Sequence, residues 1–405
     1  MNANKIPDQN RRRFIRVAGG GIIAAAVPMT ACTSISEVPK SAVAAWQLES
    51  LPQEYRRWIM AHAILAPNPH NRQPWLVDLS EPDTITVSLD TERLLPHTDP
   101  YGRQMMIGTG AMLGLLELAA IQQGYSATVS YAGNQAIDRL PGSEPLVRVE
   151  FTPLSQSPPP MQAALFEQIP NRHTERGNYN PARPVPTEFQ ENLPALLNGS
   201  SEGRIISVTD DAELFKMFSE LVKRAWYTEL ATPATMMESM NLFRVGAAEI
   251  NQHRDGIVID SYFLVMLDKL GLFDRSKPIS IESRAFKRQI EDFNTATDST
   301  PAFYVQTSSD NTRMSQIEAG VSYVKTQLYA AKLGLTMHPL SQGLQEYPEV
   351  KSVYTQMHRL INGDNQSSGQ TVQMLTRIGY PSTGTTLTGP SPRRDLQEFL
   401  NDDSF

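Results

Sequence analysis

Apolar and polar positions follow two different periods along the chain, which predicts a protein that mixes helices with strands. In residues 55–65 the apolar positions recur at spacings of three and four, as in a helix with one buried face. Residues 75–79 and 85–89 alternate instead, and the turn that contains Pro82 predicts a β-hairpin between them. Residues 105–123 are apolar on nearly every side, so we expect a central, buried helix.

The rest of the chain continues this mixture of strands and helices. Further strands are expected at residues 127–131, 146–151, 204–208, 302–307 and 374–380, and helices at residues 161–169, 211–230 and 315–332. The two long apolar helices match at a constant offset of 210 residues, through Gly110 and Gly320, Leu118 and Leu328, Ala120 and Ala330, and Gly124 and Gly334. These few identities are a modest indication of an internal repeat.

A Ser/Pro-rich stretch at residues 154–160 is the expected boundary between a first half, residues 51–155, and a second half, residues 161–405. Within the second half, residues 231–294 form a long, interrupted, Met-rich region. Its methionines fit ordinary core packing at least as well as contact with a ligand.

The first 32 residues are typical of an export signal. Arg11, Arg12 and Phe14 stand in the pattern R-R-x-F-I-R, and residues 17–27 form an uncharged run too short to span a bilayer as a mature helix. This pattern resembles a twin-arginine leader. A basic amphipathic arm is the alternative, but the run that follows is not amphipathic.

Cys32 is the only cysteine, and it directly follows Met29-Thr30-Ala31 at the end of the apolar run. The segment resembles a lipobox, in which the cysteine is acylated and becomes the mature N-terminus, with residues 33–50 as a tether. The alternative is an incidental residue beside an ordinary cleavage site. A lone cysteine forms neither an intramolecular disulfide nor a cysteine metal cluster.

Composition narrows the classes of function. The chain has 405 residues, 40% hydrophobic and 20% charged, which is typical of a soluble globular protein. Residues 1–32 carry five basic side chains and one acidic side chain, so the body is more acidic than the net charge of −7 indicates, which disfavours a nucleic-acid partner. The seven histidines show no metal-ligand spacing, so we predict no metal site and no zinc hydrolase.

Residues 66–75, APNPHNRQPW, connect the first helix to the first strand and are dense in polar side chains. Pro67 and Pro69 end the helix. His70, Asn71 and Gln73 then offer hydrogen-bonding groups that can surround a polar ligand. The alternative is a turn whose polar groups only cap the helix.

Two arginine-rich stretches in the second half add candidate anion ligands. The sequence NRHTERGNY at 171–179 holds Arg172, Thr174 and Arg176, and PSPRRDLQEFL at 390–400 holds Arg393 and Arg394. The guanidinium fork suits phosphate, because it donates two parallel hydrogen bonds and stays charged. Solvated charge clusters at helix ends are the alternative. For the second stretch, basic residues at a helix N-terminus would oppose the helix dipole.

The loop at 66–75 resembles the PSS-x-N-x-QPW loop of the FMN-dependent nitroreductases, and more closely that of their single-chain, Acg-like branch. The DP-x-GR stretch at 99–103, the RRxTxR-like stretch at 171–179, the Gly-Leu loop at 334–342 and the C-terminal PRR stretch follow in the family's order. Pro69 departs from the family, which often has serine there, so flavin hydrogen bonding from this loop is expected to be weaker or shifted.

The resemblance implies an α+β nitroreductase fold in which two fused halves form a monomeric pseudo-dimer with one composite FMN site. His70, Asn71 and Gln73 come from the first half. The second half supplies Arg172, Thr174, Arg176, Leu340, Ser341, Gln342, Arg393 and Arg394. His338 in the Gly-Leu loop is more commonly a packed turn histidine than a catalytic one. The pseudo-symmetric second site lacks the arginine motifs and is expected to be empty.

The implied activity is hydride transfer through FMN to a small-molecule acceptor, and we name no catalytic side chain. Because an exported protein meets little NAD(P)H, a membrane quinol or a redox protein is the expected donor, with the conventional NAD(P)H enzyme as the competing view. The twin-arginine machinery would be the export partner, and the location periplasmic or cell-surface, anchored to a membrane. The alternatives are a non-catalytic flavin-holding protein closed by residues 231–294, and a ligand-binding lipoprotein without flavin.

Overall fold

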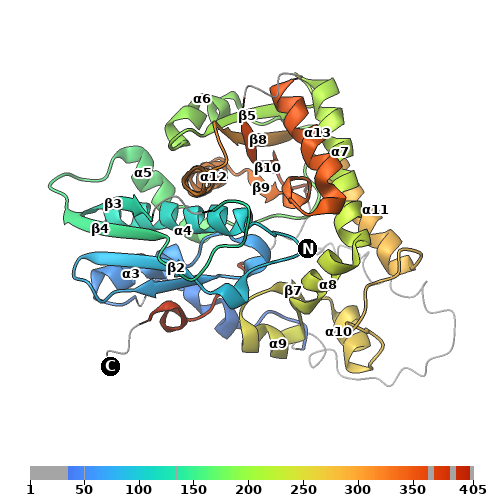
Figure 1. Ribbon diagram of the computed structural model, residues 1–405, viewed down its shortest axis with the longest axis horizontal. Coiled ribbons are helices and arrows are strands. Elements are labelled where there is room, and N and C mark those ends of the chain that lie inside the picture. Colours follow the sequence, from blue (N-terminus) through green and yellow to red (C-terminus); the bar gives the residue numbers. More distant parts are fainter. Residues whose placement is uncertain (1–34, 50, 133–135, 364–368, 384–388, 402–405) are drawn as a thin grey trace, which may run out of the picture.

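The computed structural model describes residues 35–49, 51–132, 136–363, 369–383 and 389–401. The predicted export signal and Cys32 lie outside these residues. The described chain forms two four-stranded antiparallel sheets with two long helices packed between them (Figure 1).

The first half contains the predicted hairpin and the predicted central helix. Helix α3 (Tyr55–Ala63) leads through the 66–75 loop into β1 (Trp75–Asp78) and β2 (Thr84–Leu89). Helix α4 (Arg103–Gln122) then connects to β3 (Tyr125–Tyr131) and β4 (Val147–Pro153), and the strand order is β1-β2-β4-β3. Although α4 is long and apolar enough to cross a membrane, 83% of its apolar window is buried inside the protein, as expected of a core helix.

The second half repeats this order of elements. Strands β5 (Glu202–Ser207) and β8 (Ala302–Ser308) pair, helix α12 (Arg313–Lys332) follows, and β9 (Thr336–Pro339) and β10 (Thr371–Gly379) complete the sheet. The strand order β5-β8-β10-β9 is that of the first sheet, with every pair antiparallel in both. The prediction of an α+β fold with two fused halves is therefore confirmed.

The two halves meet along α4 and α12, where glycines allow the backbones to touch. A Cβ added to Gly110 would overlap the carbonyl oxygen of Ile317, and one added to Gly320 would overlap that of Ile107. These glycines are the pair that the offset of 210 residues brings into register. The sequence repeat is thus a contact in space, and neither position tolerates a side chain without moving a helix.

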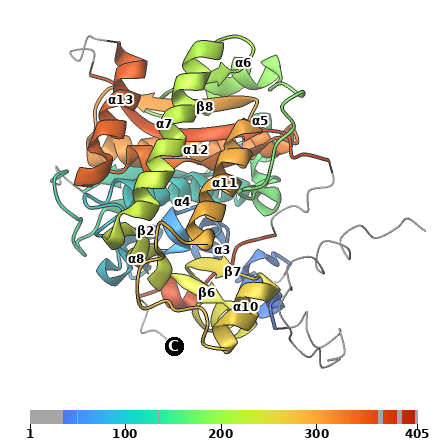
Figure 2. The same cartoon turned by 90° about the vertical axis from the view of Figure 1, so that its right-hand side faces the viewer.

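A large insertion distinguishes the second half. In the first half, five residues connect β1 to β2, whereas residues 208–301 lie between β5 and β8. The inserted elements are α7 (Ala212–Ala231), α8 (Pro233–Asn241), β6 (Phe243–Val245), α9 (Gly246–His253), β7 (Ile257–Ile259), α10 (Tyr262–Lys269) and α11 (Arg284–Asp298). We call residues 231–294 the cap. Figure 2 shows β6 and α10 at the lower end of the molecule, opposite α6 and α13.

The remaining elements connect or cover the sheets. They are η2 (Lys40–Trp46), η3 (Pro69–Asn71), η4 (Thr91–Arg93), α5 (Pro160–Phe166), η5 (Ile169–Asn171), α6 (Thr187–Leu196), η6 (Ser341–Leu344), η7 (Pro348–Val350), α13 (Lys351–Asn362) and η9 (Leu396–Phe399). Helix α6 was not expected from the sequence. It contains Pro194, and it is held by burial of Phe189, Leu193 and Leu196.

The C-terminal segment crosses back from the second half to the first. Leu400 forms a parallel bridge with Val77 of β1, and the Asn401 amide donates to the Val77 carbonyl at 2.8 Å. Buried Phe399 packs beside Trp75. Residues 390–401 therefore belong to the second half by sequence and cover the first half in space.

The α4–α12 contact yields a stability prediction. Gly320→Ala should lower the free energy of unfolding by roughly 1–3 kcal/mol or more, because the new methyl group overlaps a backbone carbonyl that cannot rotate away. Gly389→Ala is the matched control, since nothing lies within 4 Å of its Cβ position. Chemical denaturation measures both, and equal stability of the two variants would contradict the close approach of the helices.

Candidate functional site

The loop that follows α3 has a strained backbone. His70, Asn71 and Gln73 have φ values of 47°, 52° and 49°. Residues with a Cβ rarely adopt this left-handed region, although asparagine and histidine do so more often than most. Such a conformation costs up to about 1–3 kcal/mol per residue, so the surrounding structure must hold the loop in place.

Arg393 provides much of this restraint, because all its N–H groups are used within the protein. Its Nε and Nη2 bind the carbonyls that follow α3, and one Nη1 hydrogen reaches the loop itself. The five acceptors are the carbonyl oxygens of Ile64 (2.9 Å), Leu65 (3.0 Å), Ala66 (3.1 Å) and Pro392 (3.0 Å), and Oδ1 of Asn71 (2.8 Å). Arg393 therefore has no donor left for a phosphate in this conformation.

The cap holds the loop from the other side through a buried carboxylate. Asp255 lies between β6 and β7 and is 4% exposed. Its Oδ2 accepts from Arg72 at 3.1 Å and from Arg93 at 2.8 Å, while its Oδ1 accepts from Arg244 Nε at 2.9 Å. One cap carboxylate thus joins two arginines of the first half to one of the cap, and it fixes the loop next to Arg72.

Asn71 and Gln73 are also engaged with protein rather than free. The Gln73 side chain is fully buried; its Nε2 donates to the carbonyls of Asn71 (3.2 Å) and Arg254 (2.9 Å), and its Oε1 accepts from the Arg394 amide (3.0 Å). Asn71 Nδ2 donates to the Pro392 carbonyl at 2.9 Å. These two predicted cofactor ligands instead join the loop to the cap and to the C-terminal segment.

Arg394 also donates hydrogen bonds to protein groups, but only with some of its N–H groups. Its Nη1 donates to the Gln73 carbonyl at 3.2 Å, its Nη2 to the Glu398 carbonyl at 2.7 Å, and its Nε to the Glu398 carboxylate at 3.3 Å. Two of its five N–H groups remain available.

Arg172 meets Arg393 on one carbonyl. Both guanidinium groups donate to the Leu65 oxygen, and both lie over the Trp46 ring, with 5.5 Å and 5.3 Å from guanidinium carbon to ring centroid. Arg172 also reaches Gln327 Oε1 at 3.4 Å, while its buried Nε has no partner among the described residues. Within the described chain no carboxylate pairs with either arginine, and burial lowers the pKa of Arg172 to about 10.

Arg176 lies close enough to His70 and His338 for its charge to act on both. No hydrogen bond joins its guanidinium to any residue that the structure describes, although desolvation by surrounding protein lowers its pKa. We call Arg176, His70 and His338 the Arg176 cluster. Desolvation, then the charge of Arg176, lowers the pKa of His70 to about 4, and Arg176 also acts on His338. His70 Nδ1 is buried without a partner.

Arg377 of β10 positions the Arg176 cluster and sets the protonation state of His338. Its Nη2 donates to the carbonyls on both sides of Arg176, those of Glu175 (3.3 Å) and Gly177 (2.8 Å). Its Nε donates to His338 Nδ1 at 3.0 Å, so that nitrogen must be the acceptor. Burial, then Arg377, holds the pKa of His338 well below its usual value, so the imidazole is neutral and carries its proton on Nε2.

The remaining predicted residues lie along the same edge of the second sheet. Thr174 forms a parallel bridge with Met337 of β9, which places the 174–176 segment beside His338. Leu340 is buried, and its amide donates to the Leu375 carbonyl at 2.8 Å. The half-buried side chains of Thr174, Ser341 and Gln342 make no hydrogen bonds with other described residues, so their polar groups are available.

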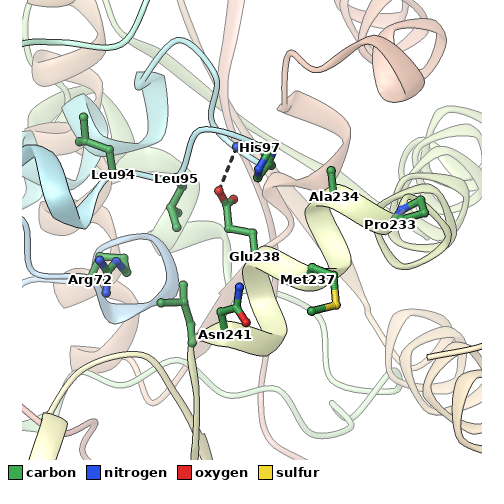
Figure 3. Close-up of a pocket in the computed structure, with 10 residues that line it drawn as sticks. Arg72, Leu94, Leu95, His97, Pro233, Ala234, Met237, Glu238 and Asn241 are labelled. Carbon is green, nitrogen blue, oxygen red and sulfur yellow. Dashed lines mark hydrogen bonds between the residues drawn. The ribbon is translucent and has the colours of Figure 1, made fainter. Parts of the chain in front are cut away.

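The cap also borders a separate cavity of about 480 Å³ between α8 and residues 94–97 (Figure 3). Glu238 closes one side, where its carboxylate accepts from the His97 amide at 2.9 Å. Arg72 lies at the far wall, but Arg176 and His338 do not line this cavity. The cap methionines mostly pack in the core, since Met236 and Met240 are buried against Phe286, and only Met237 lines the cavity.

Sequence reasoning missed several residues that build the site. Asp255 and Arg377 belong to no motif, and Trp46 falls in the stretch predicted to be a tether. Which ring nitrogen of His338 carries the proton depends on Arg377, its neighbour in the sheet. Sequence periodicity does not identify that neighbour. Of the predicted ligands, the structure leaves unpaired polar groups on His70, Arg172, Thr174, Arg176, Ser341, Gln342 and Arg394.

Comparison with known proteins supports a relationship to the nitroreductases. No protein-family model matches the chain. It is 24% identical over 357 residues to "Putative NAD(P)H nitroreductase Rv3131" of Mycobacterium tuberculosis, which covers 85% of this chain and 90% of that relative. It is 39% identical over 67 residues to "Putative NAD(P)H nitroreductase acg" of the same organism, 16% of this chain and 20% of the relative.

Solved structures of lower similarity include the FMN-dependent nitroreductase NfnB of Mycobacterium smegmatis in complex with NADPH. It has 15% identity and a TM-score of 0.36, and the match covers 60% of this chain and 98% of that chain. A nitroreductase with bound FMN from Bacteroides fragilis has 12% identity and a TM-score of 0.31, over 55% of this chain and 91% of that chain.

Arg393 and Arg176 differ in how many of their N–H groups bind other residues, and this difference gives a first prediction for the site. Arg393→Ala should lower the free energy of unfolding of the cofactor-free protein by roughly 2–4 kcal/mol, because it leaves buried carbonyls after α3 without donors. Arg176→Ala should change it by no more than about 0.5 kcal/mol. Denaturant titration compares the two variants, and a similar loss in both would mean that Arg176 also has a structural role.

A second prediction concerns the neighbourhood of His70. Arg176→Gln should raise the pKa of His70 from about 4 while leaving it below 6.5, because the positive charge is removed and the desolvation stays. NMR titration of the imidazole protons measures the change, with the exposed Arg224→Gln as control. A His70 pKa unaffected by Arg176→Gln would show that the two groups do not face one another.

Proposed function

We propose that this chain is an exported, FMN-binding oxidoreductase of the nitroreductase family that transfers hydride to an oxidised small-molecule acceptor. The curated relatives support the family, since their similarity extends over most of both chains. The structure supports a ligand site through one observation above all: among the described residues the Arg176 guanidinium has no hydrogen-bond partner, and its charge acts on His70, whose buried Nδ1 also has none.

The donor set fits the chemistry of FMN. A phosphate and a flavin ring carry many acceptors. The Arg176 cluster offers guanidinium and imidazole donors from both halves, and Thr174, Ser341 and Gln342 offer hydroxyl and amide donors. Arg172 contributes a buried Nε without a partner and Arg176 a whole guanidinium group, so these two would hold the anionic parts of the cofactor. Thr174, Ser341 and Gln342 would bind its neutral oxygens. Arg394 keeps two N–H groups, whereas Arg393 would act by holding the loop.

FMN, when bound, supplies the hydride chemistry, and the protein supplies binding, orientation and electrostatics. Arg176 would place a fixed positive charge beside the cofactor. His338, neutral and oriented by Arg377, would present Nε2–H as a donor that does not change with pH near neutrality. The cap and the 66–75 loop would limit access of water, since Asp255 joins them through buried ion pairs.

A non-catalytic flavin-holding protein is the second candidate. The observation that favours it is the same connection between cap and loop. The Arg254-Asp255-Gly256 turn contacts the loop through Gln73 Nε2 at 2.9 Å and through the Gly256 amide, which donates to the Asn71 carbonyl at 3.3 Å. A cap fixed in this way would restrict a stacked nicotinamide, and then the flavin would be retained but not reduced by NAD(P)H.

Export and lipid anchoring complete the proposal. The twin-arginine-like leader and Cys32 support a location outside the cytoplasm, where NADH and NADPH are scarce. A membrane quinol or a redox protein is then the donor. A twin-arginine route also suits a protein that acquires its cofactor before export.

Cofactor binding is tested by titration of the mature protein with FMN. We expect a yellow protein with one FMN per chain, and Arg176→Ala should weaken the affinity by roughly 10- to 100-fold, the equivalent of one lost charge-assisted interaction. Arg288→Ala, an exposed arginine of α11, is the control. Affinity unchanged by Arg176→Ala would rule out the Arg176 cluster as the cofactor site, and absence of FMN binding would leave the ligand-binding lipoprotein.

The electron donor is tested by stopped-flow reduction of the bound flavin. We expect a water-soluble quinol to bleach it faster than NADPH does, because the cap restricts the nicotinamide. Fast, saturable bleaching by NADPH, in the range of about 1–1000 per second, would favour the conventional enzyme. Reduction by dithionite alone would favour the flavin-holding alternative.

A further inference from the structure

The end of the cap carries an exposed apolar surface. Phe263 and Leu270 are each 64% exposed, and Leu272 is 68% exposed. Phe263 and Leu270 lie seven residues apart at α10 and its C-terminal turn, so they project from the same side, whereas Val265 points inward and is 2% exposed. We call Phe263, Leu270 and Leu272 the α10 surface.

The α10 surface lies close to the start of the described chain. The Ala247 amide donates to the Ile35 carbonyl at 2.9 Å, and the position of a Cβ on Gly246 would contact both that carbonyl and Val265 of α10. The described part of the chain therefore starts beside α10. Figures 1 and 2 place α10 at one extremity of the molecule, away from the second sheet.

Charge does not explain this exposure. Residues 260–282 contain four acidic and three basic side chains, and several pair with each other, as Arg275 does with Asp268 and Lys277 with Asp274. The surface is therefore close to electrically neutral, and its apolar groups gain little from a charged partner. Burial of such side chains in an apolar environment is favourable in proportion to their area.

We propose that the α10 surface rests on a lipid bilayer, into which Phe263, Leu270 and Leu272 insert their side chains. This inference rests on the proposed anchor at Cys32, because three residues span at most about 11 Å, which confines Ile35 to the membrane interface. Large apolar side chains next to a lipidated terminus provide the second signal that stable membrane attachment requires. A second copy of the chain is the other possible occupant, and the experiment separates the two.

The sole cysteine makes the test specific. The chain from Cys32 onward is coupled through its thiol to maleimide-bearing lipids in neutral phosphatidylcholine vesicles, and hydrogen exchange is compared with the same protein capped at Cys32 in solution. We expect slower exchange at residues 261–273 on vesicles, and no change at residues 212–231 of α7. Equal exchange at residues 261–273 in both states would overturn the proposal.

Serine variants test membrane binding by the α10 surface separately from the lipid anchor and from FMN binding. Without the thiol coupling, the wild-type chain should bind phosphatidylcholine vesicles weakly, and Phe263→Ser with Leu270→Ser and Leu272→Ser should lower that binding at least roughly tenfold. The matched control replaces three other exposed apolar residues, Val208, Met217 and Met314, by serine and should bind like wild type. FMN content should be the same in wild type and in both triple variants. Loss of FMN binding would therefore be distinguished from loss of membrane binding.

Equal vesicle binding by the triple α10 variant and by wild type would overturn the assignment. So would protection of residues 261–273 in solution together with a concentration-dependent dimer in sedimentation, because the surface would then be covered by a second copy.

Discussion

The carbonyl groups of the three residues that follow α3 are the point on which the site depends. The carbonyls of Met60, His62 and Ala63 in α3 accept from backbone amides of the next turn. The carbonyls of residues 64–66 are instead satisfied by guanidinium groups from two distant parts of the chain. Arg393 binds the oxygens of Ile64, Leu65 and Ala66, and Arg172 shares that of Leu65. The site therefore forms only when the second half and the C-terminal segment have returned to the first half.

The same contacts explain how a strained loop persists. Its left-handed residues, His70, Asn71 and Gln73, cost conformational energy that a free loop would avoid. Arg393 from the C-terminal segment and Asp255 from the cap hold the loop from opposite sides, and in this conformation the charge of Arg176 acts on His70. The insertion between β5 and β8 thus does more than cover the protein, because it supplies a buried carboxylate that the loop requires.

Much of the fold was accessible from the sequence, because periodicity and the glycine pair at positions 110 and 320 are properties of single segments. The positions of α4 and α12 follow this pattern, whereas the shared strand order depends on long-range pairing that only the structure shows. The different roles of the predicted site residues could not be predicted either. The motifs give Arg393 and Arg176 the same expected role, but among the described residues Arg393 uses all five of its N–H donors and the Arg176 guanidinium uses none. Asp255 and Arg377 act across the fold and leave no local signal.

The central claim is that the cap and the C-terminal segment hold the loop in the geometry that binds a cofactor. The most direct test is the FMN affinity of Asp255→Asn, measured by titration alongside Glu238→Gln. Both are cap carboxylates that bind the first half, but Glu238 contacts His97 and Thr98 rather than the loop. We predict that Asp255→Asn weakens FMN binding at least about tenfold while circular dichroism shows the fold intact, and that Glu238→Gln leaves the affinity unchanged. A folded Asp255→Asn protein with wild-type affinity for FMN would contradict the account.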